Sequence, residues 1–238
     1  MTETFVALLL AHVLADFVLQ PDRMAKGKRR PLWLAAHGGV VLGTALLATG
    51  NPHPSLLALA VAHLAIDLAK IAFKADGLAG FAADQGAHLA TLVLTAALLP
   101  DLWGEGLWSP IAPLPALMAY AAGAIAATRA GGYAIGLMMA PFAARIALDG
   151  LPGGGRTIGH LERGLIFLMI LGGLPEGIGF LIAAKSVLRF GTVKEEAKLS
   201  EYVIIGTLAS FGWAMLAAWA TIALAAHLPP LGFPAFPP

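Results

Sequence analysis

Apolar stretches long enough to cross a lipid bilayer recur along this chain, with short polar connections between them. A helix needs about 20 apolar residues to cross a hydrocarbon core roughly 30 Å thick. Within lipid, each backbone polar group must be hydrogen-bonded internally, which a helix achieves. Hydrophobic residues make up 58% of the 238 residues and charged residues only 12%, against about 25% charged in soluble domains. These features predict an all-α integral membrane protein.

We expect a polytopic bundle of about seven or eight transmembrane segments. The first four run over residues 4–20, 32–48, 56–73 and 80–99, and segments 114–128 and 202–226 also cross. Segment 132–148 crosses, re-enters or lies at the interface, and 158–190 is interrupted at 172–177, either as two short helices or as one broken helix. The chain therefore divides into a four-helix bundle over 1–100, C-terminal membrane helices over 113–227 and a proline-rich tail over 228–238.

The orientation follows from the basic residues. The densest basic cluster comes directly after the first segment and comprises Arg23, Lys26, Lys28, Arg29 and Arg30. Because cytoplasmic loops carry an excess of Lys and Arg, loop 21–31 is predicted to be cytoplasmic. The chain lacks a basic start and has polar residues in its first apolar stretch, which argues against a cleaved signal peptide.

Three motifs in the first ninety residues place a histidine and an aspartate four positions apart: His12–Asp16, His63–Asp67 and Asp84–His88. On a helix, such a pair leaves the same face one turn apart and can share a metal ion. An ionisable residue in an apolar segment is costly, and is therefore a candidate functional residue.

The estimated depths of the motif residues within the membrane suggest that the motifs meet. At about 1.5 Å per residue from the inferred cytoplasmic ends, the three motifs and His37 lie roughly 6 to 15 Å deep, in one layer. Without cysteine, the strong metal ligands of this chain are His, Asp and Glu. The predicted ligands of a divalent transition metal, zinc first and manganese or iron as alternatives, are His12, Asp16, His37, His63, Asp67, Asp84 and His88.

Seven candidates exceed the three or four usual for one metal, which leaves room for two ions or for residues that orient the ligands. Asp16 or Asp84, where not a ligand, would serve as general base. The alternative is that these residues form His–Asp hydrogen bonds that hold the bundle together without metal.

A second polar set lies in the C-terminal half. Lys185 and Arg189, four apart on one helical face, are candidates for holding a phosphate or lipid headgroup, as is Lys70 near the His63 face. Snorkelling to the interface explains Lys185 and Arg189 equally well. Glu162 and Arg163 are expected to form ion pairs beside the glycine-rich linker 151–155.

Residues 11–20, His37, 63–67 and 84–88 resemble the N-terminal signature of a family of bacterial inner-membrane proteins described only as a domain of unknown function. Residues 155–163, 178–190 and 201–208 resemble its C-terminal signature. The resemblance covers most of the chain and implies a multi-pass protein of the bacterial inner (cytoplasmic) membrane, but it supplies no activity.

A weaker similarity, in the His-xxx-Asp pairs alone, is to membrane-bound metal-dependent hydrolases under LexA control. Through them it extends to zinc-dependent phospholipases C and single-strand nucleases, whose N-terminal amine ligand has no counterpart here. This is an analogy of spacing and residue type.

Three functions follow. The first is a membrane-embedded metal-dependent hydrolase of a phosphoester or lipid-linked substrate reached from the cytoplasmic leaflet. The second is a component of a metal-ion or proton-coupled transporter. The third is a structural or signalling membrane protein. Membrane lipid is the expected partner. Nucleic acid is not indicated, and the formal net charge of +1, the sum of a few charges clustered in loops, is uninformative about partners.

Overall fold

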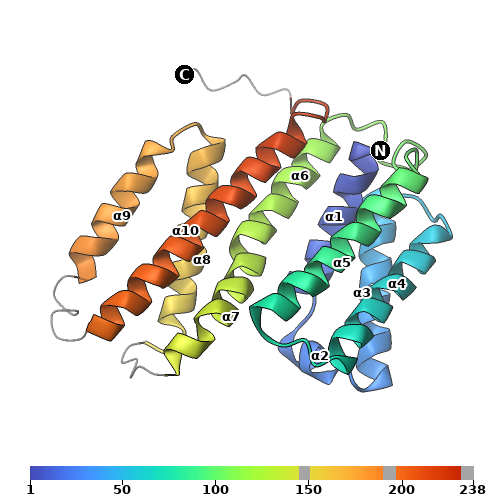
Figure 1. Cartoon of the computed structure of the whole chain (residues 1–238). Helices are drawn as coiled ribbons and strands as arrows, with labels where there is room; N and C mark the ends of the chain where they lie inside the picture. The colour runs from blue at the N-terminus through green and yellow to red at the C-terminus, as the bar shows by residue number, and fades with distance from the viewer. Residues whose placement is uncertain (145–150, 190–196, 232–238) are drawn as a thin grey trace. The chain divides into compact units, whose positions relative to one another are not determined.

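The computed structural model describes residues 1–144, 151–189 and 197–231, and every regular element in these ranges is a helix (Figure 1). The predicted all-α class is therefore confirmed. Contacts divide the chain into two units. Unit 1 comprises residues 1–125 with 223–231, and unit 2 comprises residues 126–222. Each is described by itself.

Unit 1 is built around its first helix. α1 (Thr2–Phe17) contacts α3 (Pro31–Thr49), α5 (Gly77–Leu98) and α6 (Leu114–Ile125), and α4 (Ser55–Ala72) contacts both α3 and α5. One face of α1 carries Ala7, Ala11 and Ala15, all buried. Small residues four apart let neighbouring helices approach closely. This close approach brings the side chains of His12 and Asp16, on the same helix, within reach of the surrounding helices.

Polar contacts tie the start of α1 to the loop after α5. The Thr4 hydroxyl donates to the carbonyl of Pro100 at 2.9 Å and accepts from the backbone N–H of Trp103 at 3.2 Å. The turn after α3 joins the same loop, because Asn51 Nδ2 donates to the carbonyl of Leu102 at 3.0 Å. These bonds fix the relative positions of α1, α3 and α5 along their axes.

Loop 21–31 contains a short helix, α2 (Asp22–Gly27), which the sequence did not predict. α2 contacts α3, and its Met24 side chain is buried. The loop is therefore folded against unit 1, and Lys28, which follows α2, comes close to the interior.

Unit 2 begins with a π-helix, η1 (Ala126–Ala130), which leads directly into α7 (Gly131–Ala143). Since α6, η1 and α7 follow one another without a turn, the predicted division near Arg129 is wrong. The end of predicted segment 132–148 lies outside the described residues. α8 (Gly154–Leu171) and α9 (Glu176–Arg189) are separate helices, so the interruption at 172–177 gives two helices. α10 (Ala197–Ala225) is the last.

The start of unit 2 is held by a buried arginine. The guanidinium of Arg163 donates to the carbonyl of Thr128 from Nε at 3.3 Å and from Nη2 at 3.0 Å, and from Nη1 to Ser210 Oγ at 3.0 Å. Because the π-helix leaves carbonyls outside the regular α-helical pattern, Arg163 satisfies one of them. The predicted ion pairing of Glu162 and Arg163 beside the linker is corrected in part: Glu162 pairs with Lys185 of α9, at 2.8 Å.

Among the described residues, three helices are long and apolar enough to cross a membrane, which is fewer than the seven or eight predicted: α3, α4 and residues Lys198–Ala225 of α10. Four of the others are short, with 16 residues in α1, 12 in α6, 13 in α7 and 14 in α9. In α5, Asp84, Gln85 and His88 lower the mean hydropathy, and α8 carries three charged residues. The apolar runs thus predicted helices correctly, but several of these helices are too short or too polar to count as membrane spans.

Candidate metal centre

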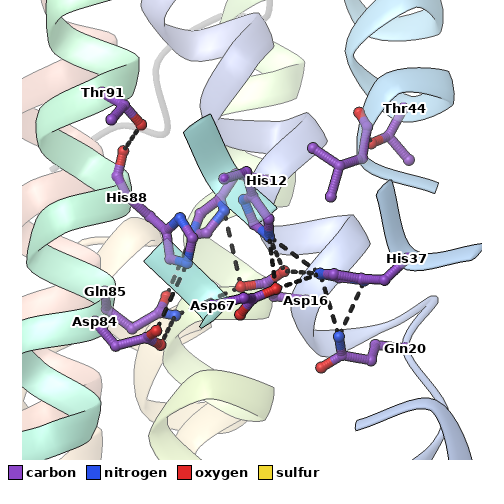
Figure 2. Close-up of polar contacts among 12 residues, drawn as sticks. His12, Asp16, Gln20, His37, Thr44, Asp67, Asp84, Gln85, His88 and Thr91 are labelled. Atoms are coloured by element: carbon purple, nitrogen blue, oxygen red, sulfur yellow. Dashed lines mark hydrogen bonds and ion pairs between the residues drawn. The ribbon is translucent and has the colours of Figure 1, made fainter. Parts of the chain in front are cut away.

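Four helices of unit 1 contribute histidines and aspartates to one buried cluster (Figure 2). The contributing residues are His12 and Asp16 from α1, His37 from α3, His63 and Asp67 from α4, and Asp84 and His88 from α5. No side chain among them is more than 8% exposed. The structure therefore brings together all seven predicted ligands, while their binding of a metal stays a prediction.

Three of these helices, α1, α4 and α5, present a histidine and an aspartate on the same face, as the spacing of four residues predicts. The nitrogen and oxygen atoms of the pairs are 3.9 Å apart in His12–Asp16, 3.8 Å in His63–Asp67 and 3.7 Å in Asp84–His88. These distances are too long for good hydrogen bonds. The two members of each pair thus point side by side into the interior of unit 1 rather than forming a hydrogen bond with each other.

The centre of the cluster is a pair of histidines from different helices. His37 Nε2 lies 3.0 Å from His63 Nε2. Asp16 Oδ1 lies 3.3 Å from both nitrogens, and Asp67 Oδ2 lies 3.4 Å from the first and 3.8 Å from the second. We call these four atoms the first donor set. Two imidazole nitrogens at this distance share a proton or face a common cation, because two lone pairs repel.

Several buried atoms of the cluster have no hydrogen-bond partner among the described residues. They are His12 Nδ1, Asp16 Oδ1, Asp84 Oδ1 and both ring nitrogens of His88. Leaving a buried polar atom unpaired costs about 1–3 kcal/mol. Such a concentration of unpaired atoms in one place is what a ligand set for a cation looks like in the absence of the cation.

Two lysines pair with the carboxylates. Lys28 Nζ lies 2.7 Å from Asp67 Oδ2, and Lys70 Nζ lies 2.9 Å from Asp84 Oδ2. Together they offset two of the three aspartate charges in the cluster. Lys70, predicted to hold a headgroup, therefore has a partner inside unit 1, and its role toward a headgroup stays a prediction.

Two amides orient the ligands. Gln85 Oε1 lies 3.2 Å from His12 Nε2, and its Nε2 donates to Asp84 Oδ2 at 3.2 Å and approaches Asp16 Oδ2 at 3.5 Å. Gln20 Nε2 lies 3.0 Å from His37 Nδ1 and 3.2 Å from His37 Nε2 (Figure 2). Where Gln85 Oε1 accepts the Nε2–H of His12, it fixes the orientation of that ring and leaves the lone pair on Nδ1 for a metal.

Sequence reasoning assigned no site role to Lys28 or Gln85. Gln85 lies inside the Asp84–His88 motif, on the turn that faces α1, so its position could have indicated contact with the ligands. From the sequence, Lys28 indicated only the side of the membrane on which loop 21–31 lies. The need for counter-charges beside three buried aspartates pointed to nearby lysines, but not to which one.

The predicted headgroup site in unit 2 is only partly described. Lys185 pairs with Glu162, and its ammonium lies 5.6 Å from the centre of the Phe211 ring. The side chain of Arg189 lies outside the described residues. Whether these residues hold a headgroup stays a prediction.

Residues 4–103 match the model of a protein family of unknown function, DUF3307. The match contains all seven residues of the cluster and ends before unit 2. It supports the predicted similarity to a domain of unknown function, while the C-terminal signature and the similarity to hydrolases stay predictions. No curated protein and no solved structure matches the chain.

Proposed function

We propose that the cluster binds a divalent transition metal, zinc in preference to manganese or iron, and that the protein is a membrane-embedded metal-dependent hydrolase. The observation that carries the proposal is the first donor set. Five of the six separations among its four atoms run from 3.0 to 3.8 Å. Zinc bonds of about 2.0–2.2 Å in a tetrahedron put neighbouring ligands about 3.3–3.6 Å apart.

Bound metal would supply a water ionised near neutral pH and would polarise a phosphoryl oxygen. A carboxylate beside it would accept the proton. Asp16 belongs to the first donor set, which leaves Asp84 as the general base when one ion is bound. Its Oδ2 is held by Lys70, and its Oδ1 is unpartnered among the described residues.

An anionic, lipid-linked substrate fits the surroundings. Arg23, Lys26, Arg29 and Arg30 are exposed on the loop whose Lys28 reaches the cluster. Such a group of cations attracts phosphate esters and anionic headgroups. The outer faces of the apolar helices expose large side chains, such as Val61 at 60% and Leu216 at 66%, as expected where helices meet lipid. We propose that the protein lies in the bacterial inner membrane, with loop 21–31 and substrate entry on the cytoplasmic side.

The test is hydrolysis by detergent-purified protein. The probes are bis(p-nitrophenyl) phosphate and vesicles containing a lipid phosphate ester, before and after chelation and on return of Zn²⁺. We expect activity that chelation abolishes, zinc restores and His37→Ala removes. His227→Ala, at an exposed histidine outside the cluster, is the matched control. Activity that survives both chelation and His37→Ala would refute the proposal.

Transport of a metal ion is the second candidate, and one observation favours it. Asp67 and Asp84 each have a lysine at 2.7 and 2.9 Å, so an ammonium can replace a departing cation at either carboxylate. Uptake of Zn²⁺ or Mn²⁺ into proteoliposomes that is lost in His63→Ala and Asp67→Asn, without hydrolysis, would favour transport. A purely structural role explains the cluster less well, because a hydrogen-bonded layer would not leave so many buried atoms unpaired.

A further inference from the structure

We infer that the cluster holds two adjacent divalent cations, the second bound by His12, Asp84 and His88, with the carboxylate of Asp16 bridging the two. This inference rests on the proposed metal function and deepens it. It assigns a role to ligands that the first donor set leaves unused.

The first support is the surplus of unpartnered atoms. His12 Nδ1, Asp84 Oδ1 and the ring nitrogens of His88 take no part in the first donor set, yet all are buried without hydrogen-bond partners among the described residues. His88 is 1% exposed. One ion in the first donor set would leave these atoms unsatisfied, whereas a second ion would bind Asp84 Oδ1, His12 Nδ1 and one ring nitrogen of His88.

The second support is that His88 lies close both to Asp84 and to His12. His88 Nε2 is 3.7 Å from Asp84 Oδ1, and the rings of His12 and His88 have their centres 5.1 Å apart. Two further groups of three ligand atoms, each with all members within 4.8 Å of one another, are His12, His63 and His88, and Asp67, Asp84 and His88. Both contain His88, so the second position lies toward α5.

The third support is the placement of Asp16 between the two sets. Its Oδ1 lies 3.3 Å from His37 Nε2 and from His63 Nε2, while its Oδ2 lies 3.9 Å from His12 Nδ1. One carboxylate thus faces both positions with different oxygens. Sites with two metals place the ions about 3.5–4 Å apart, a separation that a carboxylate can bridge.

Gln85 orients two ligands of the second ion, His12 and Asp84. When His12 Nε2–H donates to Gln85 Oε1, the lone pair of His12 is on Nδ1, which faces Asp16. The amide nitrogen of Gln85 also holds Asp84 Oδ2 at 3.2 Å, leaving Oδ1 to the cation. Gln85 is therefore a positioning residue. With two ions bound, Asp84 is a ligand and not the general base of the single-ion scheme.

Charge then indicates the substrate class. Two divalent ions with Lys28 and Lys70 carry six positive charges, against three on Asp16, Asp67 and Asp84. A buried excess of three positive charges requires anions, which a metal-bound hydroxide and a phosphate ester supply. The second ion should accordingly bind more weakly than the first, and inorganic phosphate should tighten its binding.

The test uses full-length protein in detergent, stripped with chelator and dialysed against Mn²⁺. Bound metal is measured by elemental analysis, and electron paramagnetic resonance shows whether two ions are close enough for their spins to couple. We expect two coupled ions in the wild type, and one uncoupled ion in His88→Gln and in Asp84→Asn. His227→Ala, the matched control, should keep two. Inorganic phosphate should lower the free Mn²⁺ needed for the second ion at least threefold.

Three outcomes would overturn the inference. One ion in the wild type, with or without phosphate, would leave the proposed function intact but remove the second site. Two ions without spin coupling would place the second ion elsewhere. No bound ion, with either Mn²⁺ or Zn²⁺, would contradict the proposed function as well. The phosphate titration uses only wild-type protein, so it decides the matter even if the variants fail to fold.

Discussion

Nε2 of His37 lies 3.0 Å from Nε2 of His63, although the two histidines come from different helices and neither pairs with the other in the sequence motifs. Oxygens of Asp16 and Asp67 lie 3.3 and 3.4 Å from His37 Nε2. Ligand atoms of Asp16, His37 and His63 all lie within 4.8 Å of one another, so one cation could contact all three residues.

Lys28 competes with the metal for Asp67, because its ammonium lies 2.7 Å from the Oδ2 atom of the first donor set. Lys28→Met should therefore tighten zinc binding at least tenfold in competition with a chromophoric chelator. It should also lower the melting temperature of the metal-stripped protein, since it leaves Asp67 buried and unpaired.

The control for Lys28 is Lys26→Met, which changes an exposed lysine of the same loop. It should alter neither zinc affinity nor melting temperature. Equal zinc affinity in wild type and Lys28→Met would mean that Asp67 is not a ligand.

Gln85 orients His12 and Asp84 without joining the first donor set. Gln85→Met keeps the length of the side chain but removes these contacts. Loss of an outer partner of this kind typically weakens metal binding 10–100-fold, and we expect an effect of that size for the more weakly held ion, measured by equilibrium dialysis. Gly86→Ala on the same helix is the control, because a methyl group there meets no other atom within 4 Å. Unchanged binding in Gln85→Met would remove the positioning role.

Arg163 supports unit 2 and should have no part in metal binding. It is 3% exposed and donates to Thr128 and Ser210. Arg163→Met should destabilise the protein by about 2–4 kcal/mol, because buried partners lose hydrogen bonds to a charged group. Thermal unfolding in detergent measures this, with the exposed Arg156→Met as control. A large loss of bound metal in a folded Arg163→Met protein would contradict the view that Arg163 stabilises unit 2 without taking part in metal binding.

The proposed orientation can be tested because the chain contains no cysteine. Lys26→Cys and Glu105→Cys place single thiols at exposed positions of unit 1. A membrane-impermeant maleimide added to intact spheroplasts should label the second and not the first, and opening the membrane should expose the first. The opposite pattern would reverse the predicted topology, and labelling of both in intact spheroplasts would exclude it.

The sequence predicted which residues share the buried cluster better than it predicted the architecture. His12–Asp16, His63–Asp67 and Asp84–His88 could be found because a spacing of four residues is a local property of a helix. His37 stood outside the motifs, and its estimated depth and its place in the family signature linked it to them. The contact between His37 and His63 depends on how α3 packs against α4, which periodicity does not encode.

Other features lay beyond sequence reasoning for similar reasons. The pairing of Lys28 with Asp67 requires loop 21–31 to fold back through α2, and positive charge in that loop indicated only its side of the membrane. Arg129 lies inside the π-helix η1, although the sequence placed it between segments 114–128 and 132–148. Glu162 and Arg163 of α8 were expected to form ion pairs beside the linker, whereas their partners come from α9, η1 and α10.

The most direct measurement is the transition-metal content of protein purified in detergent without added metal or chelator, compared with that of His37→Ala and His63→Ala. The account predicts at least one zinc, manganese or iron ion per wild-type chain. It predicts loss of the ion in the first donor set in both variants and full content in His227→Ala. Wild-type protein that is folded yet holds no transition metal, and takes up none on dialysis against zinc, would contradict it.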